Sequence, residues 1–175
     1  DKVGNYSFQF DGTADSVDMG DSAALDIIGH LSISCWIKMP ANSAHMWVVS
    51  KDNEGSQRSY AVNVLSSGLV RFLVSTDGTA ITTISSVSTV DDDAWHHIAC
   101  VSNGTDLRIY IDNALDGTPV AFTGAIFDST MPFELGGKSG GASKYYDGLL
   151  TEVSVFNYAL TAGNVTTLYG DATNG

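Results

Sequence analysis

Hydrophobic and polar residues alternate with a period of two along much of the chain, a pattern typical of half-buried β-strands. Residues 6–10 show it first, with two phenylalanines on one face. The strongest strand pattern is the apolar run 95–101, which follows an acidic turn at 91–93. A second run at 107–112 is expected to pair with it as a β-hairpin. We expect the other strands to be layered on this central hairpin.

Further strands are separated by short segments rich in Gly, Asp, Asn and Ser. The pattern predicts them at 17–19, 31–38, 46–51, 60–65, 69–74, 81–84, 119–122, 132–137 and 147–157. Many short strands at such regular spacing predict an all-β fold, an antiparallel two-sheet jelly-roll sandwich. We expect the first and last strands to be neighbours that close the sandwich.

One helical segment is expected near the C-terminus. Thr161 is a suitable N-cap, and Val165, Leu168 and Tyr169 follow at helical spacing on one side. The pattern predicts one short helical turn, or two.

The length and composition fit one domain over residues 1–175, because 175 residues with 43% hydrophobic content can bury a sizeable core. The chain starts with Asp rather than Met and ends in the polar run 171–175. We therefore expect a domain excised from a longer protein, with neighbouring domains of that protein among its partners.

The charge excludes some partner classes. Eight Lys and Arg against twenty Asp and Glu give a net charge of −12, which repels nucleic acids and anionic membranes. Membrane insertion is not expected either, because no apolar run approaches the ~20 residues of a spanning helix.

Several short segments, taken together in their order and spacing, resemble the laminin-G-like, pentraxin-related branch of the concanavalin A-like lectin/glucanase superfamily. They are Phe10-Asp11-Gly12, residues 31–38 with Trp36, residues 48–51, 95–99 and 107–112, Leu135-Gly136-Gly137, residues 146–149 and residues 152–160. The resemblance implies two antiparallel sheets, one of them concave. It also implies binding of glycans or protein partners outside the cell, at a cell surface or on a virion, often with calcium.

The sequence argues against an enzyme, although some members of this superfamily are glucanases. A glucanase needs two carboxylates flanking one glycosidic bond. The chain has three glutamates: Glu54 stands in a loop, and neither Glu134 nor Glu152 has an acidic residue two positions away. The alternative is a catalytic pair of carboxylates that come from two different strands.

Two other residue pairs are expected to be structural. His96 and His97 are neighbours on one strand and point to opposite faces, so they cannot share a metal ion. Cys35 and Cys100 both lie in apolar strands, and we favour buried free thiols. A single disulfide is the alternative, because the sequence does not fix the distance between their Cα atoms.

Calcium is the candidate cofactor that the resemblance implies, and two places could hold it. Asp52-Asn53 resembles the start of the pentraxin double calcium site. The later loop, residues 138–141, has no carboxylate at the matching place, so we expect that site to be absent and the loop to be a solvated hairpin tip.

The second place is a structural calcium ion at Asp11, Gly12 and Glu152. Related sandwiches share such an ion with an aspartate of the last long strand, whose position Thr151 occupies here. A local turn closed by the Asp11 side chain is the alternative.

A carbohydrate site needs an aromatic ring to stack on the sugar and polar groups to fix its hydroxyls. Tyr145 and Tyr146 are the candidates for stacking, with at least one of them exposed. The polar groups would come from the loop after residue 51, namely Asp52, Asn53, Gln57 and Arg58. The sequence therefore predicts a non-catalytic, lectin-like module for targeting or adhesion. The alternative is a structural or protein-interaction domain without glycan binding.

Overall fold

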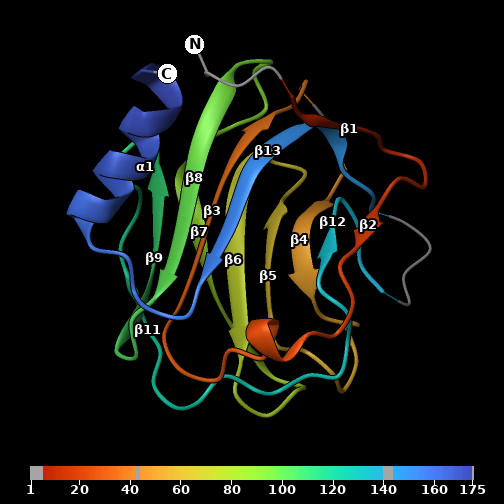
Figure 1. Cartoon of the computed structure of the whole chain (residues 1–175), viewed down its shortest axis with the longest axis vertical. Coiled ribbons are helices and arrows are strands. Elements are labelled where there is room, and N and C mark those ends of the chain that lie inside the picture. Colours follow the sequence, from red (N-terminus) through yellow and green to blue (C-terminus); the bar gives the residue numbers. More distant parts are fainter. Residues whose placement is uncertain (1–5, 42–43, 140–143, 175) are drawn as a thin grey trace.

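The computed structural model, which describes residues 6–41, 44–139 and 144–174, shows two antiparallel sheets packed face to face (Figure 1). The predicted sandwich is confirmed. Sheet A has the order β1 (Phe8–Asp11), β13 (Asp147–Phe156), β3 (Leu31–Lys38), β8 (Trp95–Ser102), β9 (Asp106–Ile111) and β10 (Ala114–Leu115), and β11 (Val120–Ala121) also pairs with β9.

Sheet B contains the predicted meander and is extended by two very short strands. Its order is β2 (Val17–Asp18), β12 (Glu134–Leu135), β4 (Met46–Lys51), β5 (Tyr60–Val64), β6 (Leu69–Ser75) and β7 (Ile81–Thr89). A 3-10 turn, η1 (Ala23–Leu25), follows β2. β12 pairs with both β2 and β4, although more than 80 residues separate it from either in the sequence.

The first and last strands are neighbours, as predicted. β1 pairs with β13 in a register that places Phe8 opposite Leu150 and Asp11 opposite Asp147. The central hairpin also forms, with β8 between β3 and β9.

The core lies between the sheets and follows the period of two. On β3, Leu31, Ile33 and Ile37 point into it together with Cys35, and Cys100 joins them from β8. Both cysteines are buried free thiols. Burial raises the pKa of Cys35 to about 12, so its reactive thiolate form is suppressed.

The C-terminal helix α1 (Ala162–Asn174) has 13 residues, so the prediction of one or two turns was wrong in length. Its start is as predicted: Thr161 Oγ1 accepts from the Asn164 N–H (3.2 Å), and Asn164 Oδ1 accepts from the Thr161 N–H (3.0 Å). This reciprocal cap satisfies two backbone donors at the helix start. Among the described residues, no helix has the length and apolar character needed to cross a membrane.

Tertiary packing explains why α1 continues. The helix lies beside β8 and β9 on the outer face of sheet A (Figure 1). Val165 is buried there against Ala99, Val101 and Tyr110. One helical turn later, Tyr169 stacks on Trp36 of β3, with ring centroids 5.5 Å apart. These contacts bury both faces of β3, which explains its continuous apolar character.

His96 and His97 have opposite surroundings, as their alternation on β8 requires. His96 contacts Asp112 through Nδ1 (2.7 Å) and Asp92 through Nε2 (3.0 Å). The hydrogen bond to Asp112, more than that to Asp92, raises the pKa of His96 to about 9. His97 is buried, its Nε2 lies 2.8 Å from Ser34 Oγ, and burial lowers its pKa to about 4.

These two shifts predict a stability maximum near pH 6.5. Below the ordinary histidine pKa of 6.5, the unfolded chain protonates at His97 before the folded chain does, so stability falls as the pH falls toward 4. His96 stabilises the fold fully below pH 6.5, and this contribution is lost as the pH rises through 9.

Thermal unfolding monitored by circular dichroism between pH 6.5 and 9.5 tests the alkaline limb. We expect the melting temperature of the wild type to decline and that of His96→Gln to stay nearly level, because glutamine does not titrate. Parallel curves for the two proteins would contradict the assignment of this limb to His96.

Candidate functional site

A polar row crosses the outer face of sheet B. Trp47 on β4 is the cross-strand partner of Asn63 on β5, which is in turn the partner of Arg71 on β6. The Arg71 Nε donates to Asn63 Oδ1 (3.1 Å), and an Arg71 terminal nitrogen lies 3.3 Å from His45 Nε2. Because a guanidinium can only donate, His45 Nε2 is the acceptor.

His45 is neutral at physiological pH. Burial, followed by the charges of Arg71 and Lys144, lowers its pKa. Its ring stacks on Trp47, with centroids 5.6 Å apart, and Lys138 Nζ lies 5.8 Å from the centroid of the Trp47 ring. The indole is therefore covered by two nitrogen-bearing side chains.

Four of the chain's eight lysines and arginines gather in this region, although the chain as a whole is strongly acidic. Two carboxylates, those of Asp52 and Glu54, lie among them. We call this surface the basic face; it comprises His45, Arg58, Arg71, Lys138 and Lys144.

Glu54 joins the two loops that the sequence placed on one rim. Its carboxylate contacts Lys138 Nζ (3.2 Å) and Lys144 Nζ (3.0 Å), which belong to the loop between β12 and β13. Burial alone would raise the pKa of Glu54, but the hydrogen bonds from Lys144 and Lys138 outweigh it and lower the pKa. The loop after β4 and the loop before β13 therefore meet, as the resemblance implied.

The loop side chains predicted to bind sugar are largely occupied within the protein. Asp52 is buried; its Oδ1 accepts from the Glu54 N–H, and its Oδ2 lies 3.1 Å from Arg58 Nε. Asn53 Oδ1 accepts from the N–H groups of Gly55 (2.8 Å) and Gln57 (3.1 Å). Such contacts are those of a closed polar hairpin tip.

Gln57 links the loop after β4 to the segment that precedes β12. Its Oε1 accepts from the Thr130 N–H (3.1 Å), and its carbonyl oxygen accepts from Ser129 Oγ (2.8 Å). Asp52, Asn53 and Gln57 thus shape the rim, and Arg58 is held there by its ion pair with Asp52.

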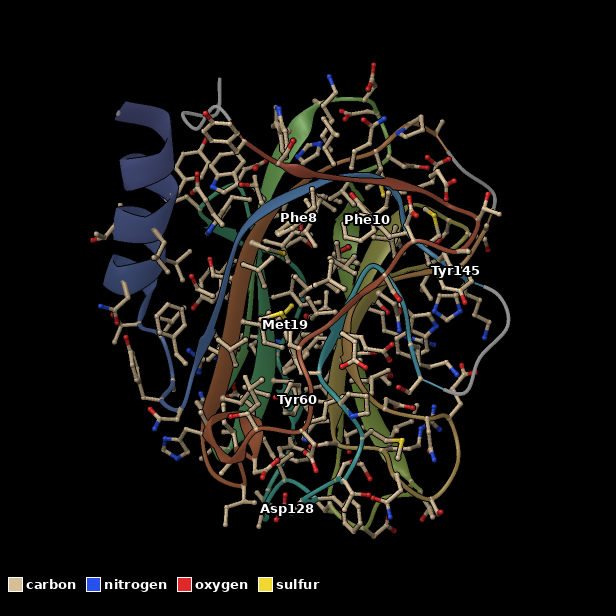
Figure 2. The ribbon with its side chains drawn as sticks, turned by 45° about the vertical axis from the view of Figure 1, so that its right-hand side comes forward. Phe8, Phe10, Met19, Tyr60, Asp128 and Tyr145 are labelled. Carbon is tan, nitrogen blue, oxygen red and sulfur yellow. The ribbon has the colours of Figure 1, made fainter. Side chains whose placement is uncertain are left out.

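The two candidate tyrosines separate as their alternation requires. Tyr146 is fully buried; its ring packs edge-on against Phe10, and its hydroxyl lies 3.3 Å from the Leu149 carbonyl oxygen. Tyr145 is half-buried and lies at the outer edge of the molecule, on the side away from α1 (Figure 2). Only Tyr145 can stack on a ligand in this conformation.

The residues of the expected structural calcium site are not brought together. Asp11 lies opposite Asp147, and its Oδ1 accepts from the Thr13 N–H (2.8 Å), which is the local turn given as the alternative. Glu152 is five residues further along β13, about 16 Å at strand spacing. Within the described ranges, no three metal-ligating side chains form a group, so Asp11, Gly12 and Glu152 do not fit the ion. Residues 140–143 of the other calcium candidate lie outside the described part of the chain.

The three glutamates lie on separate elements: Glu54 on a loop, Glu134 on β12 and Glu152 on β13. The described strands bring together two carboxylate pairs from separate strands, because Asp18 is the cross-strand partner of Glu134 and Asp11 is that of Asp147. Asp18 Oδ1 accepts from the Gly20 N–H (2.7 Å), and Glu134 is buried.

The sequence reasoning missed Arg71 and His45 as site residues. A signal for Arg71 was present, since it is a lone charge at an outward position of the apolar run 69–74. Its neighbours across the sheet depend on strand register, which the local pattern does not give.

Comparison with known proteins identifies the class. Residues 11–166 match the family model of a laminin G family described as the concanavalin A-like lectin/glucanases superfamily, so the chain belongs to this superfamily. No curated protein has a significantly matching sequence.

Solved structures share the fold at low sequence identity. The botulinum neurotoxin serotype G binding domain is 14% identical with a TM-score of 0.76, over 98% of this chain and 44% of that one. The SAP-like pentraxin of Limulus polyphemus is 20% identical with a TM-score of 0.69, over 95% of this chain and 82% of that one.

A third similar structure is that of botulinum neurotoxin type C, whose cell entry depends on interaction with two ganglioside molecules. It is 15% identical with a TM-score of 0.65, over 82% of this chain and 36% of that one. The chain thus spans about two fifths of the length of the toxin domains, and these likenesses show the fold alone.

The contacts of Glu54 predict that Glu54→Gln loosens the rim. Lys138, whose side chain is only 3% exposed, would lose its carboxylate partner. Because Glu54 is partly exposed and solvent screens the pair, we expect the melting temperature to fall by only about 2–4 °C.

Asp128→Asn is the matched control, since it makes the same acid-to-amide change at an exposed carboxylate. Differential scanning calorimetry of both variants would measure the effect. Equal melting temperatures for the two variants would show that Glu54 does not hold the rim.

Proposed function

We propose that the chain is a non-catalytic glycan-recognition module that binds an acidic sugar on the basic face. The observation that carries this proposal is Arg71. Among the described residues, no carboxylate lies within ion-pair distance of its guanidinium, although the chain has twenty acidic side chains.

The electrostatics of the basic face favour an anion. Four cationic side chains lie with two carboxylates. Burial and then the charge of Arg58 lower the pKa of Arg71, and the charges of Glu54 and Asp52 only partly oppose this shift. Arg71 and Arg58 are therefore close enough for their charges to oppose each other. A bound carboxylate relieves this repulsion, and a guanidinium can hold it through two parallel hydrogen bonds.

Tyr145 supplies the second element of sugar recognition. It is half-buried, and it follows Lys144 directly in the loop that Glu54 ties to the rim. An aromatic face next to a cationic group suits a sugar ring that carries a carboxylate. Gangliosides carry such acidic sugars, and the interaction of the type C neurotoxin with them supports this ligand class for the shared fold.

Such binding suits an extracellular, cell-surface or virion-surface module that targets or anchors a larger protein. Each site is shallow, so affinity would come from several copies. Calcium has no part in the proposal, because the contacts are a guanidinium, ammonium groups and an aromatic ring.

A glycan array that compares sialylated glycans with their asialo forms tests the anion contact. We expect the wild type to retain sialylated glycans and Arg71→Gln to bind them about tenfold or more weakly, because a hydrogen-bonded charge is lost. Arg108→Gln is the matched control, since Arg108 lies on sheet A, paired with Asp106. Equal losses in both variants would contradict an anion contact at Arg71.

The same array tests the aromatic contact and the absence of catalysis. Tyr145→Ala should lose binding with an unchanged melting temperature, whereas Tyr158→Ala, which removes a half-exposed tyrosine elsewhere, should bind normally. A chelator should have no effect, and no reducing ends should accumulate. Failure of the wild type to retain any sialylated glycan would favour the protein-interaction alternative.

A further inference from the structure

His45 contacts the guanidinium of Arg71 on the basic face. It directly precedes β4, its ring stacks on Trp47, and its Nε2 lies 3.3 Å from a terminal nitrogen of Arg71. The guanidinium is also fixed through its Nε, which donates to Asn63 Oδ1 (3.1 Å). The imidazole is therefore the immediate neighbour of the group that the proposed function assigns to the carboxylate of an acidic sugar.

The charged groups around His45 come from three parts of the chain. Arg71 lies on β6, Lys144 lies in the loop before β13, and Glu54 belongs to the loop after β4. Burial lowers the pKa of His45 most, and the charges of Arg71 and Lys144 lower it further. A hydrogen bond with Asn63 and the charge of Glu54 oppose this shift. The free protein therefore keeps the imidazole neutral beside two cations.

His45 is the member of the basic face suited to change its charge near neutral pH. Histidine is the side chain whose ordinary pKa lies between about 5 and 8. The other members are lysines and arginines, including Lys138 beside Trp47, and these residue types have ordinary pKa values above about 10. The two nearby carboxylates are engaged with cations, Asp52 with Arg58 and Glu54 with two lysines.

Protonation would change the hydrogen bonding between His45 and Arg71. The neutral ring accepts at Nε2, because a guanidinium can only donate. The protonated ring donates there instead, so the two side chains would present N–H groups and positive charges to each other. An anionic oxygen that accepts from both removes this conflict. A carboxylate has two oxygens with about four acceptor sites, which is enough for both partners.

We propose that His45 couples the binding of an acidic sugar on the basic face to the uptake of a proton, so that binding strengthens as the pH falls from about 7.5 to about 5.5. The inference rests on the proposed function, because it concerns the same anion contact at Arg71. The coupling is reciprocal: a bound carboxylate favours the imidazolium, and the imidazolium favours the carboxylate by the same factor.

Acid rather than base strengthens binding, because the proton and the ligand carry opposite charges. A carboxylate on Arg71 offsets the guanidinium charge and gives the imidazolium a partner, so the pKa of His45 is higher in the complex than in the free protein. The affinity starts to rise when the pH falls below the pKa of the complex. It levels off below the pKa of the free protein. The module would therefore retain acidic glycans most firmly in acidic surroundings.

Titration with 3′-sialyllactose, followed by nuclear magnetic resonance at the two pH values, tests the coupling. We expect the wild type to bind about threefold to tenfold more tightly at the lower pH, because one pKa unit corresponds to a factor of ten. His45→Gln keeps a side-chain oxygen that can accept from Arg71 but does not titrate. It should bind like the wild type at the higher pH and show no pH dependence.

His30→Gln is the matched control, since His30 is an exposed histidine in the loop before β3. This variant should keep the full pH dependence of the wild type. A pH dependence that persists undiminished in His45→Gln would overturn the assignment of the proton to His45.

The pKa of His45 itself provides a readout that does not require the sugar. The chain has four histidines, and substitutions to glutamine assign their imidazole signals. Arg71→Gln should raise the pKa of His45 in the free protein, because the charge of Arg71 lowers it. Arg108→Gln on sheet A, where Arg108 pairs with Asp106, should leave it unchanged. Sodium sulfate should raise the pKa of His45 above its value in sodium chloride of the same ionic strength.

Failure of the coupling is distinguishable from failure of the proposed function. Equal affinity of the wild type for sialyllactose at both pH values, with weaker binding by Arg71→Gln, would overturn the coupling alone. Absence of sialyllactose binding at both pH values would overturn the proposed function. A rise in the pKa of His45 in sulfate would then still support a proton coupled to an anion at this face, and no rise would overturn it.

Discussion

Each strand of a two-sheet sandwich has two faces, and only one of them can enter the shared core. This constraint governs the molecule, because the outer faces must be covered or carry polar groups. Sheet A covers its outer face with α1, which buries Trp36 and His97 together with the small residues of β8. Sheet B instead carries the polar row of Trp47, Asn63 and Arg71. The candidate site follows from how the outer face of sheet B is used.

The two ways of covering an outer sheet face place different side chains at the surface. A helix packed on a sheet meets it imperfectly, and beside Leu168 the mismatch leaves a hollow next to Trp36 and His97. On sheet B, loops cross the rim instead, and Glu54 fixes them by contacting Lys138 and Lys144. Cations that would be dispersed over an acidic surface are thereby concentrated on one face.

The alternation of residues predicted the sandwich, the central hairpin and the pairing of the first and last strands, because a period of two is a local property of the chain. It could not predict that β2 pairs with β12, since two-residue strands have no pattern of their own. The length of α1 was also missed, because contacts such as that of Tyr169 with Trp36 stabilise it. For the site, the sequence brought the right loops together but assigned binding to Asp52 and Asn53, which close their own turn. Arg71 becomes a site residue only through its register with Asn63.

The central claim is that the Arg71 guanidinium on sheet B, which hydrogen-bonds Asn63 and His45, binds the carboxylate of a sugar. A crystal structure of the chain with sialyllactose tests it most directly. The account predicts the sialic acid carboxylate on the Arg71 guanidinium, with the sugar ring against Tyr145. A sialyllactose molecule bound away from Arg71 in well-ordered density, with the basic face open to solvent, would contradict it.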